Sequence, residues 1–363
     1  MEFVELAELC DKGSSNLAQK DLVFDSGIYP VYGAPGEITK VDFFHQSKPY
    51  LGLIKDGAGV GRVMQLPANS SVIGTIQYIF PKENVDLKYL YYLIKYLDLG
   101  KANTGATIPH IYFKDYKKRK VKVREYSEQK HIGQILELID SYLRTYKKVL
   151  EQYDLLIKSR FVDMFGDPVL NEKGWNLTSL ESVCQSIYGG GTPSKKIKEY
   201  YMGTIPWVTS KDMKSDIIVD SIEHITQVAI DNSSTKIIPP ESVLIVIRSG
   251  ILKHTLPVCI NKSKVTINQD LKALVLDERC KGIYLQYLLK ALEKDILSGV
   301  RAVTADNIEF NSLKKREIPI PPIDIQIKFS QMVNQINKLK SDVQKSIDET
   351  QLLMDSLMQE YFG

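Results

Sequence analysis

The chain has 363 residues, of which 44% are hydrophobic and 25% are charged, and its formal net charge is +3. These proportions are typical of a soluble globular protein with a full-sized core, and the length suggests two or three domains. No run approaches the roughly 18 apolar residues of a membrane span, and the small net charge permits a polyanionic partner without requiring one.

The spacing of cysteines and histidines predicts neither a disulfide framework nor a metal site. The cysteines show no C-x-x-C spacing and no nearby second ligand, and the histidines show no metal-ligand spacing. The N-terminus lacks a basic segment followed by an apolar one, so we expect free thiols and a cytoplasmic protein. The cysteines are Cys10, Cys184, Cys259 and Cys280.

The first half of the chain reads as short strands joined by glycine turns. Residues 3–10, FVELAELC, predict a short amphipathic segment, and residues 26–38 are rich in Gly and Pro. Residues 48–66 have the pattern of a strand, a glycine turn and a second strand. An amphipathic helix is expected at residues 86–97, DLKYLYYLIKYL.

The glycine motif DGAGVG at residues 56–61 has two interpretations. It follows the strand-like YLGLI and resembles the cofactor loop of adenosylmethionine-dependent methyltransferases. Such a loop requires a helix directly after it, because backbone N–H groups and the helix dipole must face the ligand. Residues 62–67, RVMQLP, read as a strand instead, which favours a glycine hairpin turn.

Residues 129–166 predict the long helix around which the chain is organised. Its apolar residues alternate at spacings of 3 and 4, which indicates a coiled-coil seam, although a helix packed on a globular core can carry a similar stripe. The predicted seam consists of Ile132, Ile135, Ile139, Tyr142, Tyr146, Val149, Tyr153 and Leu156.

The chain ends with a second copy of this helix, residues 326–363, at a constant offset of 197 residues. Two matched stripes, each closing one half of the chain, favour two helices that pack on each other. Ser346 and Thr350 interrupt the second stripe. The predicted seam of this copy consists of Phe329, Met332, Ile336, Leu339, Val343 and Leu353.

The globular parts are duplicated as well. LESVC at 180–184 repeats LAELC at 6–10, and a second amphipathic helix is expected at 282–292. The strand and turn pattern returns around Arg248, which we expect to occupy the place of Lys55. We therefore predict a mixed α/β (α+β) fold with a pseudo-two-fold repeat: two tandem globular domains, residues 1–125 and 167–322, separated by a long antiparallel two-helix coiled coil of residues 126–166 and 323–363.

Two basic segments are candidate DNA contacts. GGGTPSKK at 189–196 could approach phosphates or base edges closely, or could be a flexible surface loop whose lysines are solvated. KDYKKRKVKVR at 114–124 could follow phosphates, and a charged edge strand explains it equally well. The sequence shows no catalytic motif: the N-P-P-[YF] loop of adenine methyltransferases, G-x-x-x-x-G-K-[ST] and a nuclease cluster of acids and lysine are not recognisable.

Taken together, the chain resembles the specificity subunits of type I restriction-modification systems. The resemblance rests on IYPVYGAPG (28–36), SRFVDMFGDP with NEKGW (159–175), GGGTPS (189–194), GTIPWVTSKDM (203–213), IPPESVLIVIRSG (238–250) and SLMQEYFG (356–363). These segments occur in the order expected for two recognition units and two long helices, and the resemblance extends over nearly the whole chain.

The resemblance implies a non-catalytic subunit that binds double-stranded DNA and reads one half of a bipartite target with each globular domain. Two methyltransferase subunits would bind adenosylmethionine and dock on the long helices, and separate restriction subunits would use ATP. No cofactor is then expected in this chain. Two other hypotheses remain open: an adenosylmethionine-dependent methyltransferase that uses residues 56–61, and a coiled-coil scaffold without DNA specificity.

Candidate DNA-binding residues are loop and strand-end groups that could reach base edges or phosphates, because Arg and Lys suit guanine and phosphate whereas Asn and Gln suit adenine. In the first half they are Tyr32, Lys55, Arg62, Gln77, Lys101, Asn103 and Thr104. In the second half they are Thr192, Ser194, Lys195, Lys211, Arg248, Lys253, Gln269 and Arg301.

Overall fold

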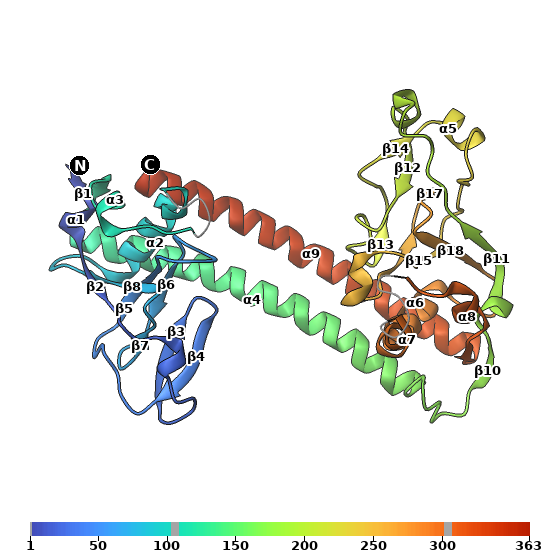
Figure 1. Ribbon diagram of the computed structural model, residues 1–363, viewed down its shortest axis with the longest axis horizontal. Coiled ribbons are helices and arrows are strands. Elements are labelled where there is room, and N and C mark those ends of the chain that lie inside the picture. The colour runs from blue at the N-terminus through green and yellow to red at the C-terminus, as the bar shows by residue number, and fades with distance from the viewer. Residues whose placement is uncertain (1, 103–108, 301–306) are drawn as a thin grey trace. The chain divides into compact units, whose positions relative to one another are not determined.

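The computed structural model describes residues 2–102, 109–300 and 307–363 (Figure 1). The chain divides into two compact units: unit 1 consists of residues 1–149 and 343–363, and unit 2 of residues 150–342. Each unit combines sheets and helices, so the mixed α/β class is confirmed. Within the described residues, no helix is long and apolar enough to cross a membrane.

Unit 1 is built on an antiparallel sheet with the strand order β2-β8-β5-β6, against which α2 packs. A smaller sheet has the order β4-β3-β7, and β1 pairs with β9 immediately before the long helix α4. The elements are β1 (Glu2–Glu5), α1 (Leu6–Leu9), β2 (Cys10–Ser14), β3 (Tyr29–Gly33), β4 (Gly36–Val41), β5 (Tyr50–Ile54), β6 (Val63–Leu66), β7 (Ser71–Val72), β8 (Ile76–Pro81), α2 (Leu87–Leu97), α3 (Phe113–Tyr116), β9 (Lys120–Val123) and α4 (Tyr126–Phe165).

Unit 2 repeats this plan with the sheet β11-β18-β15-β16-β13, the smaller sheet β14-β12-β17 and the pair β10-β19. Strand β13 and helices α5 and α7 are additions to the shared plan. The elements are β10 (Asn176–Ser179), β11 (Cys184–Gly189), β12 (Ile205–Val208), β13 (Ile217–Ile218), β14 (His224–Ile225), α5 (Gln227–Asp231), β15 (Val243–Val246), β16 (Val258–Asn261), β17 (Thr266–Ile267), β18 (Leu271–Leu276), α6 (Gly282–Ala291), α7 (Glu293–Val300), α8 (Phe310–Lys315), β19 (Glu317–Ile320) and α9 (Ile323–Phe362).

The glycine motif at 56–61 is a hairpin turn between the antiparallel strands β5 and β6. The Gly61 N–H donates to the Ile54 carbonyl at 2.8 Å, and Gly61 has a φ of +85°, which favours glycine. A Cβ on Gly61 would lie 2.1 Å from the backbone nitrogen of Gly100. Because a strand follows the turn where a cofactor loop requires a helix, the methyltransferase interpretation of this motif is wrong.

The long helices contribute to the hydrophobic core of each unit by their ends. In unit 1, Phe362 near the end of α9 packs on the ring of Tyr89 from α2, with centroids 5.2 Å apart. In unit 2, Phe165 at the end of α4 packs on Tyr284 from α6 at 4.8 Å. Within unit 2 the helices run antiparallel, since Phe165 contacts Phe329 near the start of α9, whereas Asp154, earlier on α4, pairs with Lys340, later on α9.

The buried face of each long helix differs from the predicted seam. Tyr142 is 49% exposed, Leu156 44%, Leu339 47% and Leu353 51%, so the seam prediction is wrong at these four positions. A stripe that averages 3.5 residues per turn drifts by about 20° per heptad on a straight α-helix, which explains the error. The buried positions that the seam omitted are Leu136, Leu143, Ile157, Phe161 and Phe165 on α4, and Val333, Met354, Met358 and Phe362 on α9.

The other predicted seam residues lie on or beside the buried face. Ile132, Ile139, Phe329 and Ile336 are buried, whereas Ile135, Tyr146, Val149, Tyr153, Met332 and Val343 are half-buried.

All four cysteines are free thiols, and burial raises the pKa of each to about 12. They therefore act as small apolar side chains. In the described part of the chain, no group of three or more His, Cys, Asp or Glu side chains is placed to hold a metal ion.

Candidate nucleic-acid interface

The loop between β11 and β12 contains the GGGTPS motif, and it is anchored to the body of unit 2. The indole Nε1 of Trp207 donates to the Gly191 carbonyl at 3.0 Å, and Trp207 makes an edge contact with Tyr201 at 5.7 Å. A Cβ on Gly190 would lie 1.9 Å from the Asn268 carbonyl oxygen. The glycines thus permit close approach to the protein's own backbone, and the loop has a defined surface.

The turn after β12 is organised by Asp212. One carboxylate oxygen accepts the N–H and the hydroxyl of Thr209, both at 2.8 Å, and the other accepts the N–H of Ile222 at 2.8 Å. These bonds fix the backbone that carries Lys211. The Lys211 side chain is exposed and makes no ion pair with any residue that the structure describes.

An open cleft of about 280 Å³ lies between this loop, this turn and the segment 268–270. Ile222 and Glu223 line both this cleft and a neighbouring one of about 480 Å³. The Lys195 ammonium lies 6.0 Å from the centre of the Trp207 ring, close enough for a cation–π contact. Four of the candidate residues come together in the cleft wall: Thr192, Lys195, Lys211 and Gln269.

Arg248 does not line the cleft itself, but it pairs with Asp270, which does. Its Nε lies 2.6 Å from the Asp270 carboxylate, whose other oxygen accepts a hydrogen bond from Asn268 at 2.9 Å. The remaining candidates of unit 2 add less. Ser194 is exposed on the anchored loop, Lys253 is not among the residues lining the cleft, and Arg301 lies outside the described residues.

Among the residues that the structure describes, the candidates of unit 1 line no common cleft. Gln77 is buried and accepts the Tyr116 hydroxyl at 2.6 Å, so the prediction that it reaches a base edge is wrong. Its place in the core follows from β8 being a central strand of the sheet. Arg62 donates to the Ala34 carbonyl, which fixes its side chain beside the hairpin turn.

Three further candidates of unit 1 lie at the surface or near it. Lys55 forms an ion pair with the adjacent Asp56 at 3.8 Å, and Lys101 forms one with Asp98 at 3.0 Å. Tyr32 is half-buried, and burial raises the pKa of its hydroxyl. Asn103 and Thr104 lie outside the described residues.

The expected equivalence of Lys55 and Arg248 is wrong by one residue. Asp56 forms an isolated β-bridge with His110, and Arg248 forms one with Asn307. His110 and Asn307 are 197 residues apart, the same offset as the two copies of the long helix, so the two bridges correspond. Arg248 therefore occupies the place of Asp56. A one-residue shift reverses the direction of a side chain on extended backbone, so the two basic residues do not play the same part.

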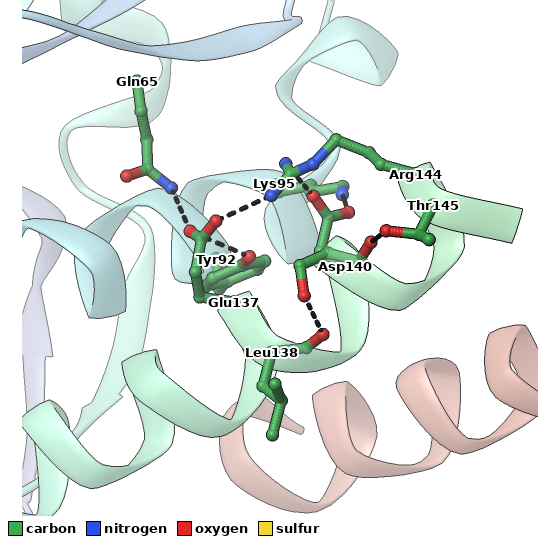
Figure 2. Close-up of polar contacts among 9 residues, drawn as sticks. Gln65, Tyr92, Lys95, Glu137, Leu138, Asp140, Arg144 and Thr145 are labelled. Carbon is green, nitrogen blue, oxygen red and sulfur yellow. Dashed lines mark hydrogen bonds and ion pairs between the residues drawn. The ribbon is translucent and has the colours of Figure 1, made fainter. Parts of the chain in front are cut away.

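Unit 1 has a polar cluster where α4 meets α2 and β6 (Figure 2). The Arg144 guanidinium donates to Glu137 at 2.8 Å. It also pairs with Asp140, which lies one turn earlier on the same helix face. The Gln65 amide donates to Glu137 at 3.2 Å. Desolvation opposes ionisation of Glu137, but the bonds from Arg144 and Gln65 outweigh it and lower the pKa of this carboxyl. The cluster joins α4 to the sheet through Gln65 of β6.

Sequence reasoning missed the residues that support the cleft. Asp212 stands three positions after Thr209, a spacing typical of side-chain bonds to a local backbone turn, and this signal could have identified it. Asn268 and Asp270 flank the predicted Gln269 and pair with each other locally, but the pairing of Asp270 with Arg248 depends on β15 and β18 lying side by side.

Comparison with known proteins agrees with this architecture. A family model for the type I restriction modification DNA specificity domain matches residues 1–152 and 172–350. The specificity subunit of the Escherichia coli type I restriction enzyme EcoR124I/EcoR124II is 34% identical over 163 residues, covering 44% of this chain and 40% of that protein. The MjaIX specificity subunit of Methanocaldococcus jannaschii is 28% identical over 217 residues, covering 57% and 48%.

Solved structures show the same fold. A type I restriction-modification S subunit from M. genitalium aligns with a TM-score of 0.68 at 16% identity, covering 100% of this chain and 96% of that one. A chain from a study of complex assembly and conformational transition of the type I R-M system aligns with a TM-score of 0.57 at 16% identity, covering 99% and 97%. In the sequence alignments, the chain spans less than half the length of the curated relatives. Because the family model matches most of its residues, the chain belongs to the family of type I restriction-modification DNA specificity subunits.

Proposed function

We propose that this chain reads a bipartite DNA target without catalysing a reaction itself. In this proposal residues 1–125 read one half-site and residues 167–322 read the other. The helices at 126–166 and 323–363 set the distance between the two readers. A DNA half-site one turn away lies about 34 to 36 Å along the duplex, which is within reach of helices of 40 residues.

The observation that supports DNA reading most directly is the cleft of unit 2. Its loop and turn are fixed by the buried Trp207 and by Asp212, whereas Lys195, Lys211 and Gln269 are exposed at its rim. A fixed backbone that carries exposed donors favours DNA binding, because less of the loop has to be ordered when the complex forms. The membership in the specificity family is independent support.

We further propose that the long helices dock two methyltransferase subunits, and through them the restriction subunits of the complex. Exposed apolar side chains on α4 support this, since Leu138 and Tyr142 in unit 1 and Leu155 and Val162 in unit 2 lie off the buried face. Neighbouring exposed apolar groups on one helix face favour a protein interface, and Leu138 and Tyr142 lie one turn apart on α4. Adenosylmethionine and ATP would then bind to the partner subunits, and the complex would act in the cytoplasm.

Expression of the chain with a type I methyltransferase subunit, followed by methylome sequencing, tests the proposal. We expect methylation at one motif with two specified halves and an unspecified gap. Methylation without a bipartite motif would contradict the reading function and favour a scaffold. Isothermal titration of the chain alone with adenosylmethionine should show no binding, and measurable binding would contradict the assignment of the cofactor to partner subunits.

A further inference from the structure

Arg248 is held in a geometry that leaves the two terminal nitrogens of its guanidinium group available for hydrogen bonds. Its Nε edge is occupied by Asp270 at 2.6 Å, and its backbone is fixed on both sides, by a hydrogen bond to the Asp270 carbonyl at 3.2 Å and by the bridge to Asn307. The side chain is half exposed. A guanidinium has five N–H donors, so the terminal nitrogens remain able to donate as a pair.

Asp270 is itself fixed, which makes the arginine a preorganised donor. Its second carboxylate oxygen accepts the Asn268 amide at 2.9 Å, and its backbone N–H donates back to Asn268 at 3.1 Å. Asn268 is buried, and its N–H donates to the Val208 carbonyl of β12 at 3.0 Å. The whole chain of contacts thus rests on the strand backbone.

Gln269 is oriented in a similar way. The Thr192 hydroxyl donates to its Oε1, so the amide nitrogen of Gln269 points away from Thr192. The oxygen keeps a second lone pair and the nitrogen has two donors, so the amide can accept and donate side by side. Gln269 is exposed and lines the cleft, and it lies next to Asp270 in the sequence.

Unit 1 has the same backbone frame with different side chains. The Lys55 N–H donates to the Thr75 carbonyl, as the Ile247 N–H donates to the Asp270 carbonyl, so Thr75 corresponds to Asp270 and Gly74 to Gln269. Asp56 stands in the place of Arg248. Unit 1 therefore repeats none of the three side chains Arg248, Gln269 and Asp270. The frame was duplicated, and this set of side chains is specific to unit 2.

We propose that unit 2 reads a guanine with Arg248 and an adjacent adenine with Gln269, an inference that rests on the proposed DNA-reading function. A bidentate arginine matches O6 and N7 of guanine, and a bidentate glutamine matches N6 and N7 of adenine. The charges of the cleft agree with base readout. Asp212, Glu223 and Asp270 line it together with two lysines, so the wall is not the uniformly basic surface that phosphates favour.

The test compares methylation motifs of the full chain and of variants, each expressed with the same methyltransferase subunit. Arg248→Ala should abolish the preference for one guanine in one half-site, and Gln269→Glu should abolish the preference for the neighbouring adenine and favour cytosine, because a carboxylate only accepts. Each loss should be about tenfold or more in preference at that position. Arg248→Gln, which keeps a planar polar group, replaces Arg248→Ala if that variant is insoluble, and should convert the guanine preference to adenine.

Arg279→Ala is the matched control. Arg279 is also exposed and paired to a neighbouring carboxylate, Asp277, but its terminal nitrogen is already bonded to Asp277 and to the Ser182 carbonyl. This variant should keep the complete wild-type motif. If wild-type protein yields a bipartite motif that Arg248→Ala and Gln269→Glu leave unchanged, the assignment of these two readers is wrong while DNA reading stands. If wild-type protein yields no bipartite motif, both proposals fail.

Discussion

The side-chain oxygen of Gln129 accepts a hydrogen bond from the backbone N–H of Asp86 at 3.0 Å. Asp86 is the N-cap residue of α2, and the Gln129 amide nitrogen donates to the Arg124 carbonyl at 2.8 Å, so one buried side chain ties α2 to the start of α4. Gln326 does the same in unit 2, where it accepts from Lys281, the N-cap residue of α6, at 2.9 Å. The duplicated units therefore share their polar junctions as well as their strands.

Replacing Gln129 by Leu should destabilise unit 1 by about 2 to 4 kcal/mol. The apolar side chain fills a similar volume, but it leaves the Asp86 N–H and the Arg124 carbonyl without their partner in a buried place. Urea denaturation followed by circular dichroism measures the change. Gln134→Ala is the control, since Gln134 is exposed on the same helix and its loss should alter the free energy of unfolding by less than about 0.5 kcal/mol. Equal effects of the two substitutions would contradict the role of Gln129 in joining α2 to α4.

The two aromatic ends of the long helices permit a paired experiment. Phe165→Ala and Phe362→Ala should each cost about 3 kcal/mol, since each removes a buried ring from one core. Both tryptophans of the chain, Trp175 and Trp207, lie in unit 2. We therefore expect Phe165→Ala to lower the denaturation midpoint seen by tryptophan fluorescence, and Phe362→Ala to lower only the part of the circular dichroism transition that belongs to unit 1. Leu352→Ala, at an exposed position of α9, should change neither.

Local patterns predicted most of the secondary structure because they depend on neighbouring residues. The helix at 86–97, the turn at 56–61 and the two long helices agree closely with α2, the β5–β6 hairpin, α4 and α9. The seam failed at Tyr142 and Leu156, since the face that a long helix buries depends on which elements meet it along its length. No sequence pattern specified those contacts.

The candidate site was only partly predictable for a similar reason. Thr192, Lys195 and Gln269 could be proposed from residue type and loop position, and they do line one cleft. Gln77 looked equally suitable, but a polar residue in a central strand can satisfy a core hydroxyl instead, here Tyr116. The pairing of Arg248 with Asp270 requires knowledge of strand register, which the sequence does not contain.

The stability of unit 1 should fall on the acid side in a way that depends on Glu137. Its pKa lies below the ordinary value of 4.5, because bonds from Arg144 and Gln65 outweigh desolvation. A depressed carboxyl pKa stabilises the folded state above the unfolded pKa, and this contribution is lost as the pH falls through the folded pKa. Glu137→Gln should therefore lower stability at pH 7 and flatten the decline below about pH 4.5. Urea midpoints between pH 3 and pH 7 measure it, and Glu151→Gln, an exposed carboxylate on α4, should keep the wild-type slope.

Lys195 and Lys211 should contribute to affinity without contributing to sequence preference. An ammonium is a point charge that suits phosphates, so each Lys→Ala change should weaken binding to all sequences similarly. The slope of log affinity against log salt should become shallower by about 1 for each lysine removed. Fluorescence anisotropy with duplexes at several salt concentrations measures the slope. Lys345→Ala, at an exposed position of α9, should leave it unchanged, and a slope unaffected by Lys195→Ala would show that this lysine contacts no phosphate.

If the long helices set the distance between two readers, their length should determine the gap in the target. Four residues added to one helix lengthen it by about 6 Å, since each residue adds about 1.5 Å. A base pair adds about 3.4 Å to the duplex, so the unspecified gap should grow by one or two base pairs. The bases in the two half-sites should stay the same, because the insertion leaves both cores and the cleft of unit 2 intact. Methylome sequencing of the variant reads gap and half-sites together, and altered half-sites with an unchanged gap would show that the helices do not act as a ruler.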